Sequence, residues 1–137
     1  MTAPRSIRVQ RCLAALLAIS AGLLLRRFGY DLGLSFFVVK YGGSAFWGAM
    51  VFLASATLTG SVNIGRLAVT AFLIALSVEL SRLYHTPAMD AFRLTVAGKL
   101  LLGRVFSLWN IAAYAVGISI AATVEAWRLR RGRGSAA

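Results

Sequence analysis

The sequence predicts an all-α, polytopic membrane protein with four transmembrane helices and a short interfacial or re-entrant helix between spans three and four. Hydrophobic residues make up 59% of the 137-residue chain and charged residues 14%, whereas soluble proteins carry about 25% charged residues. Residues 41–65 and 105–124 carry no charge, and most charges stand at the ends of apolar stretches. Because about 18 or more apolar residues can cross a bilayer as one helix, we expect a single transmembrane domain over 1–137.

The first span is expected near 11–27, and charges bound it on both sides. Arg11 precedes the apolar stretch, and the pair Arg26 and Arg27 closes it. Arginine can bury its stem in hydrocarbon while its guanidinium reaches the headgroups, so such boundaries are tolerated. We expect a basic tail over 1–10 and a first helix that is retained and not cleaved as a leader.

The second and third spans are expected near 43–60 and 65–84. The glycine pair Gly42 and Gly43 opens the second span, and residues 28–40 connect it to the first. Glycine breaks a helical pattern, so this pair is the predicted start of the second helix.

A helix-start signal follows the third span. Thr86 can cap a helix and Pro87 fits its first position, so a short amphipathic helix is expected near 87–98. This helix is too short to cross the bilayer, which places it at the interface or makes it re-entrant. The fourth span is expected near 106–127, and a basic tail follows over 128–137.

Basic residues favour one orientation by a narrow margin. Four spans place both termini on the same side, and cytoplasmic sides carry an excess of Arg and Lys. Eight basic residues fall on the side of the termini (Arg5, Arg8, Arg11, Arg66, Arg128, Arg130, Arg131, Arg133) and seven on the other (Arg26, Arg27, Lys40, Arg82, Arg93, Lys99, Arg104). We therefore expect an inner-membrane protein with both termini in the cytoplasm.

Composition argues against several classes of function. Cys12 and His85 are the only cysteine and histidine, so no Cys/His metal spacing exists and we expect neither a metal nor a cofactor. The net charge is +11, but the basic residues flank apolar segments, which is the pattern of membrane topology and not of a nucleic-acid site. Membrane lipids are the expected partners, and a homo-oligomer or a partner membrane protein stays an open alternative.

The candidate functional residues collect on the side opposite the termini. Glu79 and Arg82 are three residues apart, so they share one face of the third span. An ionisable group inside a span costs roughly 2.5–3.5 kcal/mol and faces protein or a cavity. Glu79 is therefore a structural partner of Arg82, an acid–base or ligand-orienting residue, or a side chain exposed at the interface. Arg93 either pairs with Asp90 or joins a basic ring for a phosphate or an anionic headgroup, whose other members are Arg26, Arg27, Arg82 and Arg104.

The fourth span contributes Asn110 and Tyr114, on a face of small residues that lets helices approach closely. Asn110 is expected to point into protein, where it makes either an interhelical hydrogen bond or a ligand contact. Ser44 lies on a similar small-residue spacing in the second span. The candidate ligand-binding residues are thus Glu79, Arg82, Arg93, Asn110, Ser44 and Tyr114, and no catalytic residue can be assigned.

Five short motifs, in this order and spacing, resemble the domain-of-unknown-function 2809 family of small integral-membrane proteins. They are Tyr41–Trp47, Glu79–His85, Asp90–Arg93, Leu102–Phe106 and Trp109–Gly117. The resemblance covers nearly the whole chain and implies a bacterial membrane protein of no established activity. The later half is also similar, more loosely, to the VanZ-like glycopeptide-resistance family.

The chain departs from the family pattern at three positions. The family tends to have an acid at Ser44, glutamine at Arg82 and an acid at Asn110. The resemblance therefore implies no proton or cation chemistry at those positions here.

The leading interpretation is a non-enzymatic membrane protein whose outward polar pocket binds an anionic lipid or lipid-linked headgroup. One alternative is a membrane enzyme acting on a lipid-linked substrate, with Glu79 as general base. Another is a small transporter or channel subunit, which would require an oligomer because the chain is so short.

Overall fold

The computed structural model describes residues 2–103 and 105–135, and it is helical throughout that part apart from turns and loops. Four helices are long and apolar enough to cross a membrane, so the predicted fold class is confirmed. The helices are α1 (Arg5–Phe28), α2 (Phe36–Thr59), α3 (Ile64–Ser81), α4 (Pro87–Leu94), α5 (Val96–Leu101) and α6 (Leu108–Gly134).

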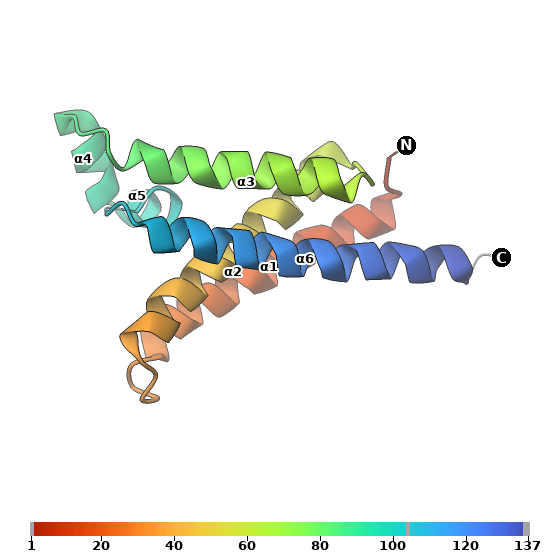
Figure 1. The fold of residues 1–137 in the computed structure, drawn as a ribbon, viewed down its shortest axis with the longest axis horizontal. Coiled ribbons are helices and arrows are strands. Elements are labelled where there is room, and N and C mark those ends of the chain that lie inside the picture. The colour runs from red at the N-terminus through yellow and green to blue at the C-terminus, as the bar shows by residue number, and fades with distance from the viewer. Residues whose placement is uncertain (1, 104, 136–137) are drawn as a thin grey trace.

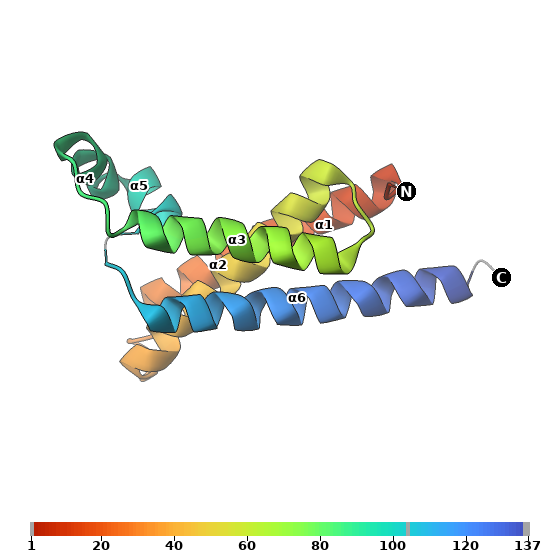
Figure 2. The same ribbon diagram turned by 45° about the horizontal axis from the view of Figure 1, so that its top comes forward.

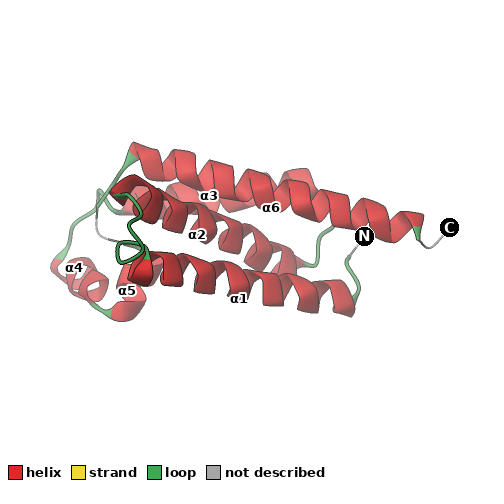
Figure 3. Ribbon diagram, turned by 90° about the horizontal axis from the view of Figure 1, so that it is seen from below, coloured by secondary structure: helices red, strands yellow, loops and turns green. Residues whose placement is uncertain are grey.

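Helix α2 is the centre of the bundle, because α1, α3 and α6 all pack against it (Figure 1). Both chain ends and the α2–α3 turn lie at one end of the bundle, here called the terminal end. The α1–α2 loop lies at the opposite end, here called the loop end, where α4 and α5 project beyond α3 (Figure 2). Figure 3 shows α2 between α1 and α6, and within the described residues the backbones of α1 and α6 do not pack against each other.

Three helices extend beyond the predicted spans. Helix α1 begins at Arg5, within the predicted tail, because basic side chains of its first turns find acceptors on the neighbouring helices. Helix α2 begins at Phe36, where Ser35 Oγ accepts from the Val38 N–H at 3.3 Å, so the predicted glycine start lies inside the helix. Helix α6 continues to Gly134, through most of the predicted C-terminal tail.

The predicted interfacial helix is two helices, and α3 ends at Ser81, before the predicted limit at 84. Thr86 caps α4 as expected, its hydroxyl accepting from the Met89 N–H at 3.2 Å. At Thr95 the backbone turns extended (φ −71°, ψ 160°) and the hydroxyl accepts from the Gly98 N–H at 3.0 Å. A second cap at this position ends α4 and starts α5, which the apolar pattern alone did not indicate.

The bundle buries charge and exposes hydrocarbon. Three of the five largest fully buried side chains are charged, with exposed fractions of 0%, 0% and 1% for Arg11, Glu79 and Glu125. By contrast, Leu17 is 71% exposed and Leu58 80% exposed. In a water-soluble protein, charged side chains are rarely buried and large apolar side chains rarely cover so much of the surface. This distribution therefore fits a bundle surrounded by lipid.

Helices α2 and α6 cross with their backbones nearly in contact. A Cβ placed on Gly117 would lie 1.9 Å from the carbonyl oxygen of Ala45, and one on Gly48 would lie 2.8 Å from that of Tyr114. Only glycine fits at both positions, as in other small-residue helix interfaces in membranes. This crossing fixes how the polar residues of the two helices face each other.

Candidate functional site

Glu79 is the centre of a buried polar network at the loop end. Its Oε2 lies 2.6 Å from Arg82 Nη1 and accepts from the Tyr114 hydroxyl at 2.9 Å. Its Oε1 accepts from the Ser107 N–H at 2.7 Å and from Asn110 Nδ2 at 3.2 Å. Four donors from α3, α6 and the preceding loop thus hold one carboxylate, and the side chain has no solvent access.

The network continues to α2 and back to α3. Ser44 Oγ donates to Asn110 Oδ1 at 3.1 Å, and Arg82 Nη2 donates to the Tyr114 hydroxyl at 3.1 Å. Five of the six candidate residues are therefore connected: Ser44, Glu79, Arg82, Asn110 and Tyr114. The small-residue crossing explains the connection, because it brings Ser44 of α2 against Asn110 of α6.

Arg82 also ties the α5–α6 loop to α3. Its guanidinium donates to the backbone carbonyls of Leu102 and Val105. It passes so close to Gly103 that a Cβ there would lie 2.6 Å from Nη2. Gly103 has φ +67°, a conformation that side chains rarely adopt, so this loop position is suited to glycine on both counts.

A cavity of about 450 Å³ opens beside the network. Its walls come from α1, α2, α5, α6, the two loops that precede α2 and α6, and the C-terminal end of α3. They include Ser44, Asn110 and Tyr114 but not Glu79. Four basic side chains line it: Arg26, Lys40, Arg82 and Lys99. The rest of the lining is mostly apolar, and Trp47 lies against Tyr114 with ring centroids 5.0 Å apart.

Arg26 reaches the cavity by crossing the backbone of α2. A Cβ on Gly43 would lie 2.4 Å from Arg26 Nε, so the arginine side chain occupies the space that a larger residue would fill. Its neighbour Arg27 points elsewhere, with Nη1 3.8 Å from Asp31 and a side chain that is 71% exposed. Of the predicted basic ring, Arg26 and Arg82 line the cavity, Arg27 and Arg93 do not, and Arg104 lies outside the described residues.

Arg93 is the candidate residue that the structure places outside the network. It donates to the backbone carbonyls of Tyr84, at 2.8 Å, and Ser81, and Nη1 lies 3.1 Å from Asp90 Oδ1. It thereby caps the C-terminal end of α3, which favours cations there. The hydrogen bond with His85, and to a smaller extent the one with Arg93, lowers the pKa of the Asp90 carboxyl.

We expect Arg93→Gln to detach α4 from α3 while the four-helix core remains folded. The substitution removes charge-assisted hydrogen bonds worth about 1.5–3 kcal/mol, so amide exchange across α4 should accelerate by about tenfold or more. Hydrogen exchange of the protein in detergent measures this rate, and Arg27→Gln on the exposed pair is the matched control. Unchanged exchange in α4 would show that Arg93 does not hold this helix.

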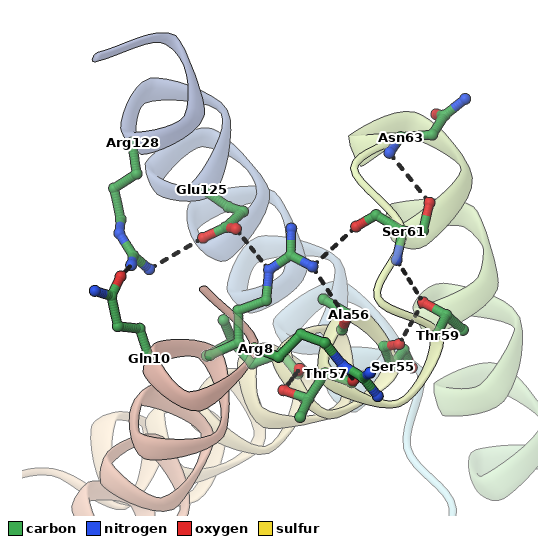
Figure 4. A network of polar contacts seen from close by, with 12 residues as sticks. Arg8, Gln10, Ser55, Ala56, Thr57, Thr59, Ser61, Asn63, Glu125 and Arg128 are labelled. Atoms are coloured by element: carbon green, nitrogen blue, oxygen red, sulfur yellow. Dashed lines mark hydrogen bonds and ion pairs between the residues drawn. The ribbon is translucent and has the colours of Figure 1, made fainter. Parts of the chain in front are cut away.

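A second buried ionic cluster lies at the terminal end (Figure 4). Arg11 Nε lies 2.7 Å from Glu125 Oε1, and its Nη1 donates to the carbonyls of Ala56 at 3.0 Å and Ser61 at 2.9 Å. Arg128 Nη1 lies 3.1 Å from Glu125 Oε2, and its other amino group donates to Gln10. Sequence reasoning treated Arg11 as a boundary residue and did not single out Glu125. Glu125 is one of the chain's four acids and lies inside the fourth expected span, so its position in the sequence could have indicated a buried ion pair.

The fold and these sites define a class: a multi-pass helical membrane protein with an ion pair buried at each end of the bundle. A family model described as "Protein of unknown function (DUF2809)" matches residues 34–118. The chain belongs to this family, which confirms the resemblance seen in its motifs. No solved structure matches the chain. All six candidate residues fall within the matched part, whereas Arg11 and Glu125 lie outside it.

Proposed function

We propose that the protein binds an anionic lipid or lipid-linked headgroup in the cavity at the loop end. The observation that carries the proposal is the lining of four basic side chains within a largely apolar wall. Arg82 is neutralised by Glu79, but Arg26, Lys40 and Lys99 have no acidic partner in the part of the chain that the structure describes. A cavity with such an excess of positive charge attracts an anion, and arginine binds phosphate oxygens through its fork.

The position of the cavity supports an amphiphilic ligand over a free anion. The cavity lies between α1, α2 and α6 at the loop end, and residues of all three helices line it. Apolar residues such as Ile19 and Leu23 of α1 line the cavity. A headgroup among the basic residues would leave its acyl chain beside these residues, in contact with the bilayer.

The contacts of Glu79 favour a binding function over a catalytic one. Both of its oxygens already accept hydrogen bonds, and Arg82 is ion-paired with it. A general base needs access to a substrate proton, and Glu79 does not line the cavity. Its supported role is to hold Arg82, Asn110 and Tyr114 in place at the cavity wall.

We also propose a bacterial inner membrane as the location, with the terminal end in the cytoplasm. The family resemblance and the basic tails support this orientation. The cavity would then open toward the outer leaflet of that membrane.

Lipid retention by paired arginine variants tests the binding proposal. Arg26→Gln should weaken binding of phosphatidylglycerol by about tenfold, because a charge-assisted hydrogen bond is worth about 1.5–3 kcal/mol. Native mass spectrometry of the detergent-solubilised protein resolves successive bound lipids and gives their affinities. Phosphatidylcholine is the neutral control lipid.

Arg27→Gln is the matched control, since it removes the same charge from the adjacent position outside the cavity. It should leave the affinity within about twofold of wild type. Equal affinities for wild type and Arg26→Gln would refute binding in this cavity.

A further inference from the structure

A second cavity, of about 510 Å³, lies at the terminal end between the first turns of α1 and the last turns of α6. Three arginines of α6 line it: Arg128, Arg131 and Arg133. Its apolar wall includes Ile7 and Trp127. Nothing in the network around Glu79 reaches this cavity, so it is a separate site.

Two of the three arginines of this cavity have contacts that hold them in place, and the cavity as a whole is not neutralised. Arg128 is fixed between Glu125 and Gln10, and the Arg131 guanidinium lies 4.0 Å from the centroid of the Trp127 ring. Glu125 is the one nearby acid among the described residues, and it already faces Arg11 as well as Arg128. The site therefore keeps a net positive charge. The contacts of Arg128 and Arg131 orient two of its guanidinium groups in advance, which lowers the entropic cost of binding an anion.

The length of α6 places this cavity at the level of lipid headgroups. Its 27 residues span about 40 Å as a helix, which is about the thickness of a bilayer including both headgroup regions. The Trp127 ring, half exposed beside the cavity, fits the interfacial belt that tryptophan occupies. A ligand at this depth has a charged head and an apolar body.

We infer that this cavity binds the phosphate of an anionic phospholipid from the leaflet at the terminal end. The phosphate oxygens would meet Arg128, Arg131 and Arg133, while the glycerol and upper acyl chain lie against Ile7 and Trp127. This lipid is additional to the ligand of the loop-end cavity and lies in the opposite leaflet.

Two double variants with the same net charge distinguish binding in this cavity from general attraction of anionic lipid to a basic surface. Arg131→Gln with Arg133→Gln removes two arginines that line the cavity. Arg5→Gln with Arg130→Gln removes two exposed arginines of the same end that do not line it. Each charge-assisted hydrogen bond to the phosphate strengthens binding by roughly tenfold or more, so the first variant should bind one dioleoylphosphatidylglycerol about 100-fold more weakly. The second should stay within about twofold of wild type.

Native mass spectrometry again gives the stepwise affinities. All proteins compared carry Arg26→Gln, which weakens lipid binding in the loop-end cavity. Quenching of Trp127 fluorescence by phosphatidylglycerol brominated near the headgroup locates the lipid independently, in protein with Trp47→Phe and Trp109→Phe. Equal weakening by both double variants, or Trp127 quenching that is the same for brominated phosphatidylcholine, would overturn the inference. Selective weakening and selective quenching would establish it, whatever the loop-end cavity binds.

Discussion

Glu125→Leu is expected to destabilise the bundle by about 3–5 kcal/mol. The substitution leaves the guanidinium of Arg11 fully buried without its carboxylate, and removing one partner of a buried ion pair has an effect of this size. Arg11 is already short of partners, because its Nη2 is buried with no hydrogen-bond partner in the described residues. Unfolding of the purified protein in mixed micelles of increasing denaturing detergent measures the loss.

The double variant Arg11→Met with Glu125→Leu separates a buried charge from a packing defect. It replaces the pair by apolar side chains of similar volume, which in other proteins is often neutral or stabilising. We therefore expect the double variant to recover most of the stability that Glu125→Leu loses. Val124→Leu, at a lipid-facing neighbour on the same helix, should change stability by less than about 0.5 kcal/mol. A double variant that is as unstable as Glu125→Leu alone would contradict this account.

Gly117→Ala is expected to push α2 and α6 apart and to cost about 1–3 kcal/mol, the usual range for overpacking. The added methyl group would lie 1.9 Å from the carbonyl oxygen of Ala45, which is backbone and cannot rotate aside. The same micelle unfolding experiment measures the change. The hydrogen bond between Ser44 and Asn110 bridges the same two helices, so phosphatidylglycerol binding in the loop-end cavity should weaken as well.

Gly132→Ala is the matched control for this prediction. It makes the same substitution on α6, where a Cβ meets no atom within 4 Å. There the change should be neutral or stabilise by up to about 1 kcal/mol, because alanine is the better helix former. Equal stability of the two alanine variants would show that the close crossing does not limit the packing of α2 against α6.

The four long helices could be predicted because hydropathy alone determines where a chain can cross a bilayer. Their ends could not, because they depend on contacts between distant residues. Arg11 was expected to mark the start of the first span and to reach the headgroups. It is buried instead, because Glu125, 114 residues later, accepts its charge, and the helix begins earlier, at Arg5. The glycine pair before Ser44 suggests a helix start in the sequence, yet in the fold Gly43 gives Arg26 room to cross α2 and Gly42 lies close to Leu25.

The candidate site was predictable in part for a related reason. Glu79 and Asn110 stand out because polar groups inside apolar helices seek each other, and the structure places them 3.2 Å apart. Arg93 has the same chemistry, but it lies on α4, outside the spans, where backbone carbonyls at the end of α3 are its nearest acceptors. Position relative to helix ends, which the sequence shows only approximately, decided which arginine faces the cavity.

The bond between Arg11 and Glu125 has a consequence for biosynthesis. The arginine lies on α1 and its carboxylate on α6, so α1 is synthesised well before its partner. Until α6 follows, we expect the guanidinium of Arg11 to stay at the level of the headgroups, which its long stem allows. The depth of α1 in the membrane then depends on the arrival of α6, which makes the insertion of two helices distant in sequence cooperative.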